Sequence, residues 1–321
     1  MGALLRSDPA SGWRGTAFGL ELEAGFPAAG LDDLSASPTG SPVSLGLMAA
    51  ERLRALWRPL EARTLVSQEI PAMTLDEHPA LGYLLATADF GSYLLSRDGS
   101  MVRCAPPDHD HWHWQRFLTG HVLPLAALLR GFEVFHASAV ETDAGVIAFV
   151  GGSGAGKSSL ALALVTRGAG LFTDDVLVVR PEDERLVAHP GAGVVNLRHA
   201  EHARLVAAGA QLGREIGRDD KGVRVRAAVR ERPRPLAALY FLNRFSQGPG
   251  PRFDRVEDVD PARLLAATYN FAIRTPRRLV NQLDVCARLA ADVPLYEVSC
   301  PASVDASTLA GHVATHAEER I

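Results

Sequence analysis

A glycine-rich segment in the middle of the chain has the residue types and spacing for phosphate chemistry. It fits the phosphate-loop pattern G-x-x-x-x-G-K-[ST] at every fixed position. Backbone N–H groups of such a loop turn onto phosphate oxygens, and the N-terminus of a following helix favours an anion. The segment therefore predicts a nucleoside triphosphate site, with ATP as the expected cofactor. Its residues are Gly151, Gly152, Ser153, Gly154, Ala155, Gly156, Lys157, Ser158 and the adjoining Ser159.

Two side chains of this loop have a direct chemical role in the prediction. Lys157 is expected to reach the β- and γ-phosphates, and the Ser158 hydroxyl is expected to coordinate Mg²⁺. Among the 33 basic residues only Lys157 and Lys221 are lysines, which singles them out against a background of arginine. A compact ammonium group on a flexible stem suits a phosphate cradle. A glycine-rich turn without a ligand is the alternative.

The elements around the loop must hold it in place. The apolar run 146–150 predicts a buried strand, and the run 160–165 predicts a helix that begins near residue 157. Gly168 and Gly170 can end that helix, and a short strand can then return toward the loop. Strand, loop and helix in this order are the context that the phosphate-loop pattern requires.

Two adjacent carboxylates, Asp174 and Asp175, follow this returning strand, 17 and 18 residues after Lys157. Beside Mg-ATP, such a pair can divide the work: one holds the metal and the other accepts a proton from a substrate hydroxyl. The alternative is a turn at a strand end with solvated acids. His136 precedes the hairpin that leads into the loop strand, where it could bond the catalytic carboxylate or a phosphate oxygen, although a lone histidine is usually structural.

Four stretches together resemble the catalytic domain of HPr kinase/phosphorylase, with matching spacings. The resemblance covers roughly 130–300 and implies an α/β fold shared with ATP-dependent phosphoenolpyruvate carboxykinases. It also implies that Asp174 is the general base, Asp175 a Mg²⁺ ligand and His136 an assisting group. The stretches are Phe135–Val140, Gly151–Ser159, Arg167-Gly168 and Asp174–Val176.

Other stretches are similar to the wider group of HPr-kinase-related proteins, which includes peptide serine kinases of lasso-peptide pathways and a free-serine kinase. Residues 190–198 lack the Arg-Gly-rich acidic signature of true HPr kinase/phosphorylases, so HPr itself is not the expected substrate. Lys221 and Arg198 are candidate substrate-contacting residues, although Lys221 could pair with its neighbouring aspartates. The similar stretches are Asp220-Lys221, Arg234–Tyr240 and Val293–Tyr296.

The composition changes along the chain. All four tryptophans and all four methionines lie before residue 115, and both lysines lie after it. We therefore expect a β-rich, substrate-selecting α+β domain over 1–130 and an HPr-kinase-like ATP-binding catalytic domain over 131–321. The finer expectations are a loop over 31–44, an antiparallel sheet over 62–104, and helices over 45–60, 114–130, 262–268 and 278–290.

Charge and cysteine content exclude several classes of protein. The net charge of −4 gives no global signal for nucleic-acid binding, and no stretch reaches the length of a membrane span. Three scattered cysteines and the absence of a secretory leader indicate a cytoplasmic protein. The tract 108–113 could bind a metal, contact the substrate or form a solvated loop. The basic group Arg274, Arg277 and Arg278 could hold ATP or start a solvated helix.

Together these features predict an ATP- and Mg²⁺-dependent kinase that acts on a serine-type hydroxyl. The acceptor would be a peptide or a small molecule, and a homo-oligomer is compatible with the sequence. A nucleotide-dependent switch or scaffold, which binds ATP without transferring phosphate to an acceptor, is the alternative. A carboxykinase-like lyase is a third hypothesis, but it needs a metal site and substrate arginines that the sequence does not place.

Overall fold

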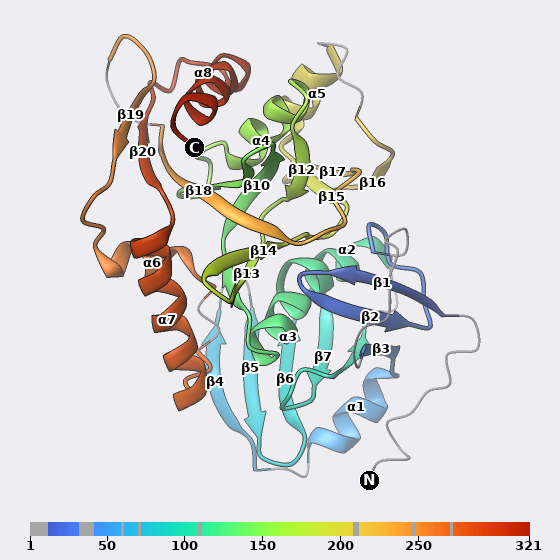
Figure 1. Ribbon diagram of the computed structural model, residues 1–321. Helices are drawn as coiled ribbons and strands as arrows, with labels where there is room; N and C mark the ends of the chain where they lie inside the picture. Colours follow the sequence, from blue (N-terminus) through green and yellow to red (C-terminus); the bar gives the residue numbers. More distant parts are fainter. Residues whose placement is uncertain are drawn as a thin grey trace. The chain divides into compact units, whose positions relative to one another are not determined.

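The chain forms a mixed α/β structure with several sheets (Figure 1). The computed structural model describes residues 12–31, 42–58, 61–69, 72–107, 111–207, 212–244, 248–269 and 272–321. It divides into two compact units. The first unit is Met1–Phe132 with Asn270–Arg278, and the second is Glu133–Tyr269 with Leu279–Ile321. The sequence predicts a single boundary near residue 130, whereas the segment Asn270–Arg278 also groups with the first unit.

The first unit is built on an eight-stranded sheet with the order β1-β2-β3-β8-β7-β6-β5-β4. The meander β4 to β8 is antiparallel throughout, which confirms the sheet expected over 62–104. Buried and partly buried residues alternate along β2, as expected for a strand with one face on the core. The strands are β1 Trp13–Ala17, β2 Leu20–Ala24, β3 Val43–Leu47, β4 Arg63–Gln68, β5 Met73–His78, β6 Gly82–Thr87, β7 Gly91–Leu95 and β8 Met101–Ala105.

The expected helix over 45–60 is wrong at its start. Residues Val43–Leu47 form β3, which pairs in parallel with β2 and β8, and the helix α1 spans only Ala50–Trp57. The side chains of Val43 and Leu45 are buried, so the local period is two rather than 3.6. Within the expected loop 31–44, residues 32–41 lie outside the described residues.

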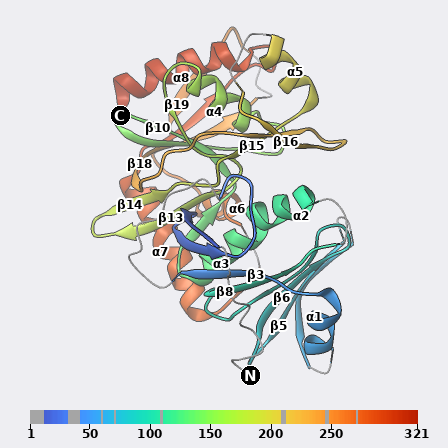
Figure 2. The same ribbon diagram turned by 90° about the vertical axis from the view of Figure 1, so that its right-hand side faces the viewer.

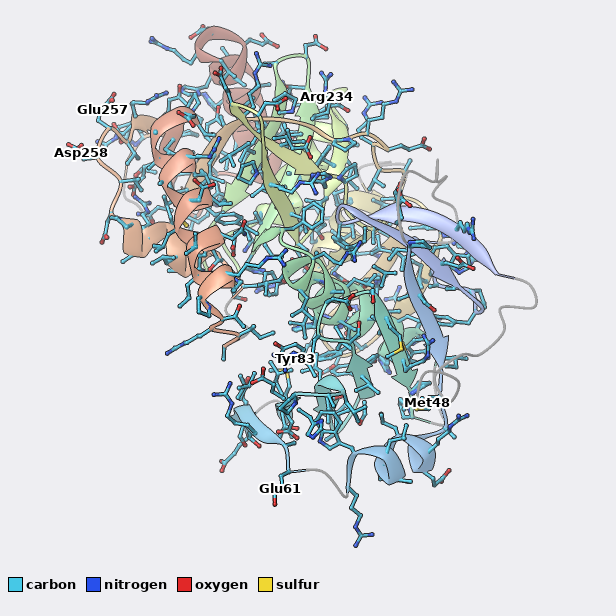
Figure 3. All side chains as sticks on the ribbon, turned by 60° about the horizontal axis from the view of Figure 1, so that its bottom comes forward. Met48, Glu61, Tyr83, Arg234, Glu257 and Asp258 are labelled. Atoms are coloured by element: carbon cyan, nitrogen blue, oxygen red, sulfur yellow. The ribbon has the colours of Figure 1, made fainter. Side chains whose placement is uncertain are left out.

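Helix α1 covers part of this sheet, and Leu53 on the helix joins Leu84, Leu94 and Ala105 in one apolar cluster (Figure 2). Tyr83 on β6 is also buried, and its hydroxyl donates to Glu77 Oε1 at 3.5 Å (Figure 3). Side chains from the helix and from three strands thus share one core within the first unit.

The helix expected over 114–130 occurs as three consecutive pieces. These are α2 His111–Phe117, a π-helical turn η1 Leu118–Val122, and α3 Leu123–Leu129. Pro124 lies in the first turn of α3 and has no N–H for an i→i−4 bond. The wider turn just before it accommodates this missing donor, a common role of π-type turns inside helices.

The second unit contains a nine-stranded sheet with the path β12-β10-β11-β18-β14-β13-β9, with β20 beside β18 and β19 beside β20. Strand β11 pairs antiparallel with β10 and parallel with β18. The strands are β9 Glu133–Phe135, β10 Ala137–Thr142, β11 Gly145–Val150, β12 Gly170–Thr173, β13 Leu177–Glu182, β14 Arg185–His189, β18 Arg234–Asn243, β19 Arg252–Arg255 and β20 Leu295–Ser299.

Both faces of β11 are buried, which explains its continuous apolar run. Ile147 and Phe149 join the core beneath α4 Lys157–Val165 and α8 Ala306–Arg320, two helices that lie side by side (Figure 1). Val146, Ala148 and Val150 join the opposite core, with α6 Pro261–Ala267 and α7 Pro276–Asp292. The structure thus confirms the strand over 146–150 and the helices over 160–165, 262–268 and 278–290.

A small three-stranded sheet completes the second unit. It consists of β15 Val194–Leu197, β17 Val223–Arg226 and β16 Glu215–Arg218. Residues 208–211, which precede β16, lie outside the described residues. Helix α5 His199–Ala207 leaves the end of β15 (Figure 2). Arg234 marks the start of β18, and Glu257 and Asp258 are exposed in the loop before α6 (Figure 3). None of the described helices combines the length and apolar character that a membrane crossing needs.

Candidate active site

The phosphate-loop residues connect the end of β11 to the start of α4. Gly154 and Gly156 have φ angles of 84° and 88°, a left-handed backbone that favours glycine. A Cβ atom on Gly151 would lie 3.0 Å from the Leu242 carbonyl oxygen and 3.1 Å from Ala155 Cβ, so glycine also suits this close approach. The loop therefore has the backbone that the sequence pattern demands.

Lys157 begins α4, and its side chain is buried. Its Nζ donates a hydrogen bond to the Gly151 carbonyl oxygen at 2.9 Å, across the loop. Burial lowers the pKa of Lys157, while the charges of Asp175 and Asp174 act in the opposite direction. The ammonium group thus lies inside the loop and interacts electrostatically with the acid pair.

Asp174 stands where β12 ends, and the sheet brings it to the loop. Strand β12 pairs antiparallel with β10, with Ala139 opposite Thr173, so Asp174 comes to lie beside Ser138. The Ser138 hydroxyl donates to Asp174 Oδ1 at 2.7 Å, and the Asn196 backbone N–H donates to Oδ2 at 3.2 Å. The loop serine Ser158 also hydrogen-bonds this carboxylate. The general base implied by the resemblance and the implied Mg²⁺-binding serine are therefore direct neighbours.

Burial and the adjacent charge of Asp175 raise the pKa of Asp174 to about 7. The hydrogen bonds from Ser138, Ser158 and Asn196 act against this rise, because they stabilise the ionised carboxylate. A carboxylate in such a setting is a stronger proton acceptor than an ordinary aspartate.

Asp175 adopts a left-handed backbone with φ of 65°, which is uncommon for a residue other than glycine. The Val176 N–H donates to the Asp174 carbonyl oxygen at 2.8 Å and closes a tight three-residue turn around it. The Asn196 side-chain amide donates to Asp175 Oδ2 at 3.0 Å, and the Tyr269 hydroxyl donates to its carbonyl oxygen at 3.4 Å. Strained backbone at a catalytic centre is a recurrent feature of such sites.

His136 lies between β9 and β10, on the same side as the acid pair. Its backbone N–H donates to the Ala267 carbonyl oxygen at 2.8 Å, and its Nδ1 is 3.5 Å from the Tyr269 hydroxyl. Burial lowers the pKa of His136, and the Lys157 charge lowers it further, while Asp175 opposes this. Burial and the Lys157 charge thus favour the neutral form of this imidazole.

Three residues of this site have no signal in the sequence that would single them out: Ser138, Asn196 and Tyr269. Ser138 belongs to a stretch used for the resemblance, but without its own assignment. Asn196 lies 22 residues from Asp174, whose carboxylate it bonds, and Tyr269 lies 94 residues from Asp175, whose carbonyl oxygen it bonds, so only the folded chain brings them together. Polar residues that orient a functional side chain often come from distant parts of the sequence, so the folded structure is needed to identify them.

The two candidate substrate residues lie at one end of the small sheet. Arg198 follows β15, and its Nη2 is 3.1 Å from the position that a Cβ atom on Gly154 would take. Lys221 is exposed in the turn between β16 and β17, where its backbone N–H donates to Asp219 Oδ1 at 2.9 Å. Since Leu197 pairs with Val223, this turn and Arg198 share the same end of the sheet. The Arg198 guanidinium thus lies beside Gly154 of the phosphate loop, and Lys221 lies in the turn at the same end of the sheet.

The oxygen atoms present fit a Mg²⁺ ion that is bound together with a nucleotide. Among the described residues, no cluster of three or more His, Cys, Asp or Glu could hold a metal by itself. Mg²⁺ is usually bound by one or two carboxylates together with phosphate oxygens and water, so Ser158 and Asp175 suffice. Of the tract 108–113, residues 108–110 lie outside the described residues.

Comparison with known proteins adds one local match. No family model matches the sequence. Over 55 residues the chain is 42% identical to an HPr kinase/phosphorylase of Chlorobium phaeovibrioides. The match supports an HPr-kinase-like family. It spans 17% of this chain and 17% of the length of that curated relative.

A solved structure, the Hpr(Ser) kinase/phosphatase from Coxiella burnetii, is also similar to this chain. It is 16% identical, with a TM-score of 0.32 over 58% of this chain and 97% of that one. In the chain described here, Asp174, Asp175, His136 and Lys157 form one connected site around the loop.

Proposed function

We propose that this HPr-kinase-like chain is an ATP- and Mg²⁺-dependent kinase that phosphorylates a serine-type hydroxyl of a peptide or small molecule. The single observation that carries this proposal is the position of the buried Asp174 carboxylate, which is held by Ser138 and Asn196 and interacts with Ser158 and Lys157 of the loop. This arrangement joins a phosphate-binding loop to a buried carboxylate, and phosphoryl transfer needs this pairing of phosphate positioning with a proton acceptor. The local match to a protein named as a kinase supports the same conclusion.

In the proposed reaction, backbone N–H groups of 151–158 hold the nucleotide phosphates and Lys157 neutralises their charge. The acceptor O–H gives its proton to the Asp174 carboxylate as its oxygen bonds to the γ-phosphorus. The bond from the γ-phosphorus to the β–γ bridging oxygen breaks, and ADP leaves. When bound through Ser158 and Asp175, Mg²⁺ would supply charge neutralisation at the phosphate oxygens. The His136 ring would interact with the charges of Asp175 and Lys157 and so assist in positioning both side chains.

The proposal includes the finer assignments of fold and partners. The second unit would have the phosphoenolpyruvate carboxykinase-like core, and the first unit would select the acceptor. The parallel pairing of β11 with β18 at the loop and the antiparallel return of β12 support such a core. Cytoplasmic ATP would be the phosphate donor.

A product analysis tests the proposal. Wild-type protein and Lys157→Ala are incubated with Mg-ATP and either free serine or serine-containing peptides, and the products are followed by ³¹P NMR. A kinase forms ADP and a phosphomonoester in equal amounts, and Lys157→Ala forms neither. ADP and inorganic phosphate without a phosphorylated acceptor, across the panel, would contradict the proposal and favour a nucleotide-dependent switch.

A further inference from the structure

Arg198 is placed against the phosphate loop by the small sheet of the second unit. Along β15, Val195 and Leu197 are buried in the core, whereas Asn196 faces the acid pair and its side-chain amide bonds Asp175. Successive side chains of an extended segment alternate between faces, so Arg198 projects to the same side as Asn196. Its guanidinium accordingly lies beside Gly154, with Nη2 3.1 Å from where a Cβ atom there would be.

The backbone of Arg198 is held at both sides. Its carbonyl oxygen accepts a hydrogen bond from the His202 N–H at 2.9 Å, in the first turn of α5. On the other side, a Cβ atom on Gly222 would come within 3.3 Å of Arg198 Cα, which shows how closely the β16–β17 turn packs there. The backbone of Arg198 is therefore held in place, while its side chain is exposed.

We propose that Arg198 binds the terminal phosphate of the nucleotide and makes the site prefer a nucleoside triphosphate to a diphosphate. This inference rests on the proposed function. The backbone of the loop serves the inner phosphates, and the acid pair marks the place of transfer. Asn196 bonds Asp175 of the acid pair, and Arg198 lies beside Gly154 of the loop. A nucleotide bound by the loop would place its terminal phosphate between these two residues. The planar fork of a guanidinium matches two oxygens of one phosphate, which an ammonium group cannot do.

Binding measurements with two probes test the proposal. Full-length wild type, Arg198→Ala and Arg198→Lys are titrated by calorimetry with Mg-ADP and with Mg-AMP-PNP, a triphosphate that is not hydrolysed. For Arg198→Ala we expect the affinity for Mg-AMP-PNP to fall by about tenfold or more and the affinity for Mg-ADP by less than about threefold. Arg198→Lys should lie between wild type and alanine for the triphosphate.

The matched control is Arg204→Ala on α5, which removes another exposed arginine of the same region, one that is paired with Glu201 at 2.8 Å. It should bind both probes as wild type does. Equal losses for both probes in Arg198→Ala, or no loss, would overturn the inference and leave the proposed function standing. A wild-type protein that binds neither probe would overturn the proposed function and the inference with it. If the alanine variant is unfolded, Arg198→Gln compared with Arg198→Lys gives the same contrast.

Discussion

Lys157 shows how one buried charge serves the proposed chemistry. Its ammonium group is inside the loop and donates to the Gly151 carbonyl oxygen. We expect Lys157→Ala to weaken Mg-ATP binding by at least about tenfold, since charged hydrogen bonds of this kind contribute about 1.5–3 kcal/mol. Isothermal titration with Mg-ATP measures this. Affinity equal to that of wild type would rule out the loop as the nucleotide site.

The two aspartates should respond differently to the same change. Asp174→Asn removes the proton acceptor but leaves the loop intact, so Mg-ATP still binds while phosphoryl transfer falls by about 10²–10⁴-fold. Asp175→Asn removes a proposed metal ligand, so the requirement for Mg²⁺ and the nucleotide affinity should change together. Single-turnover kinetics over a range of Mg²⁺ concentrations separates the two. Near-normal transfer in Asp174→Asn would show that another group is the base.

At the scale of the elements, β14 carries a histidine that makes folding depend on pH. Burial lowers the pKa of His189 from 6.5 to about 4, so the folded protein holds it neutral. Its contribution to stability is present above pH 6.5 and is lost as the pH falls from 6.5 toward 4, because the unfolded chain binds the proton first. The largest loss is about 3 kcal/mol for a pKa difference of this size.

Urea unfolding of wild type and His189→Gln at pH 7 and pH 4.5 measures this effect. The free energy of unfolding of wild type should fall more than that of His189→Gln between these values. His312→Gln, which changes an exposed histidine on α8, is the control and should keep the pH dependence of wild type. Identical pH dependence in His189→Gln and wild type would show that His189 does not contribute.

The elements around the loop could be predicted from the sequence because each has a local signal. Residues 146–150 are apolar throughout, and Gly154 and Gly156 allow the left-handed backbone that the loop needs. The register that joins β10 to β12, and so Ser138 to Asp174, is a long-range property that no local pattern encodes. The strand Val43–Leu47 could not be predicted, because five residues are too few to distinguish the two-residue alternation of a strand from the 3.6-residue period of a helix.

At the scale of the whole molecule, the two compact units should respond separately to change. Leu94 is fully buried in the first unit, in the cluster with Leu53 and Leu84. Leu94→Ala should destabilise that unit by about 2–5 kcal/mol, the usual range for a large cavity-forming substitution. It should leave the affinity for Mg-ATP unchanged and impair only the use of the native acceptor.

Calorimetry of the full-length chain, with and without Mg-ATP, measures both parts of this prediction. Mg-ATP should raise the unfolding temperature of the second unit alone, since a ligand stabilises the part that binds it. Leu94→Ala should lower the other transition. If Mg-ATP shifts both transitions, or if Leu94→Ala weakens Mg-ATP binding, the division of labour between the units is wrong.

The segment Asn270–Arg278 has a consequence for the order in which the protein is made. It belongs to the first unit, although most of the second unit precedes it in the chain. Domains generally fold during synthesis in the order in which they leave the ribosome. Here the last segment of the first unit is translated only after β9 to α6 of the second unit have been synthesised. The unit whose synthesis begins first therefore receives its last segment late, and a chain that ends before residue 270 would lack part of both units.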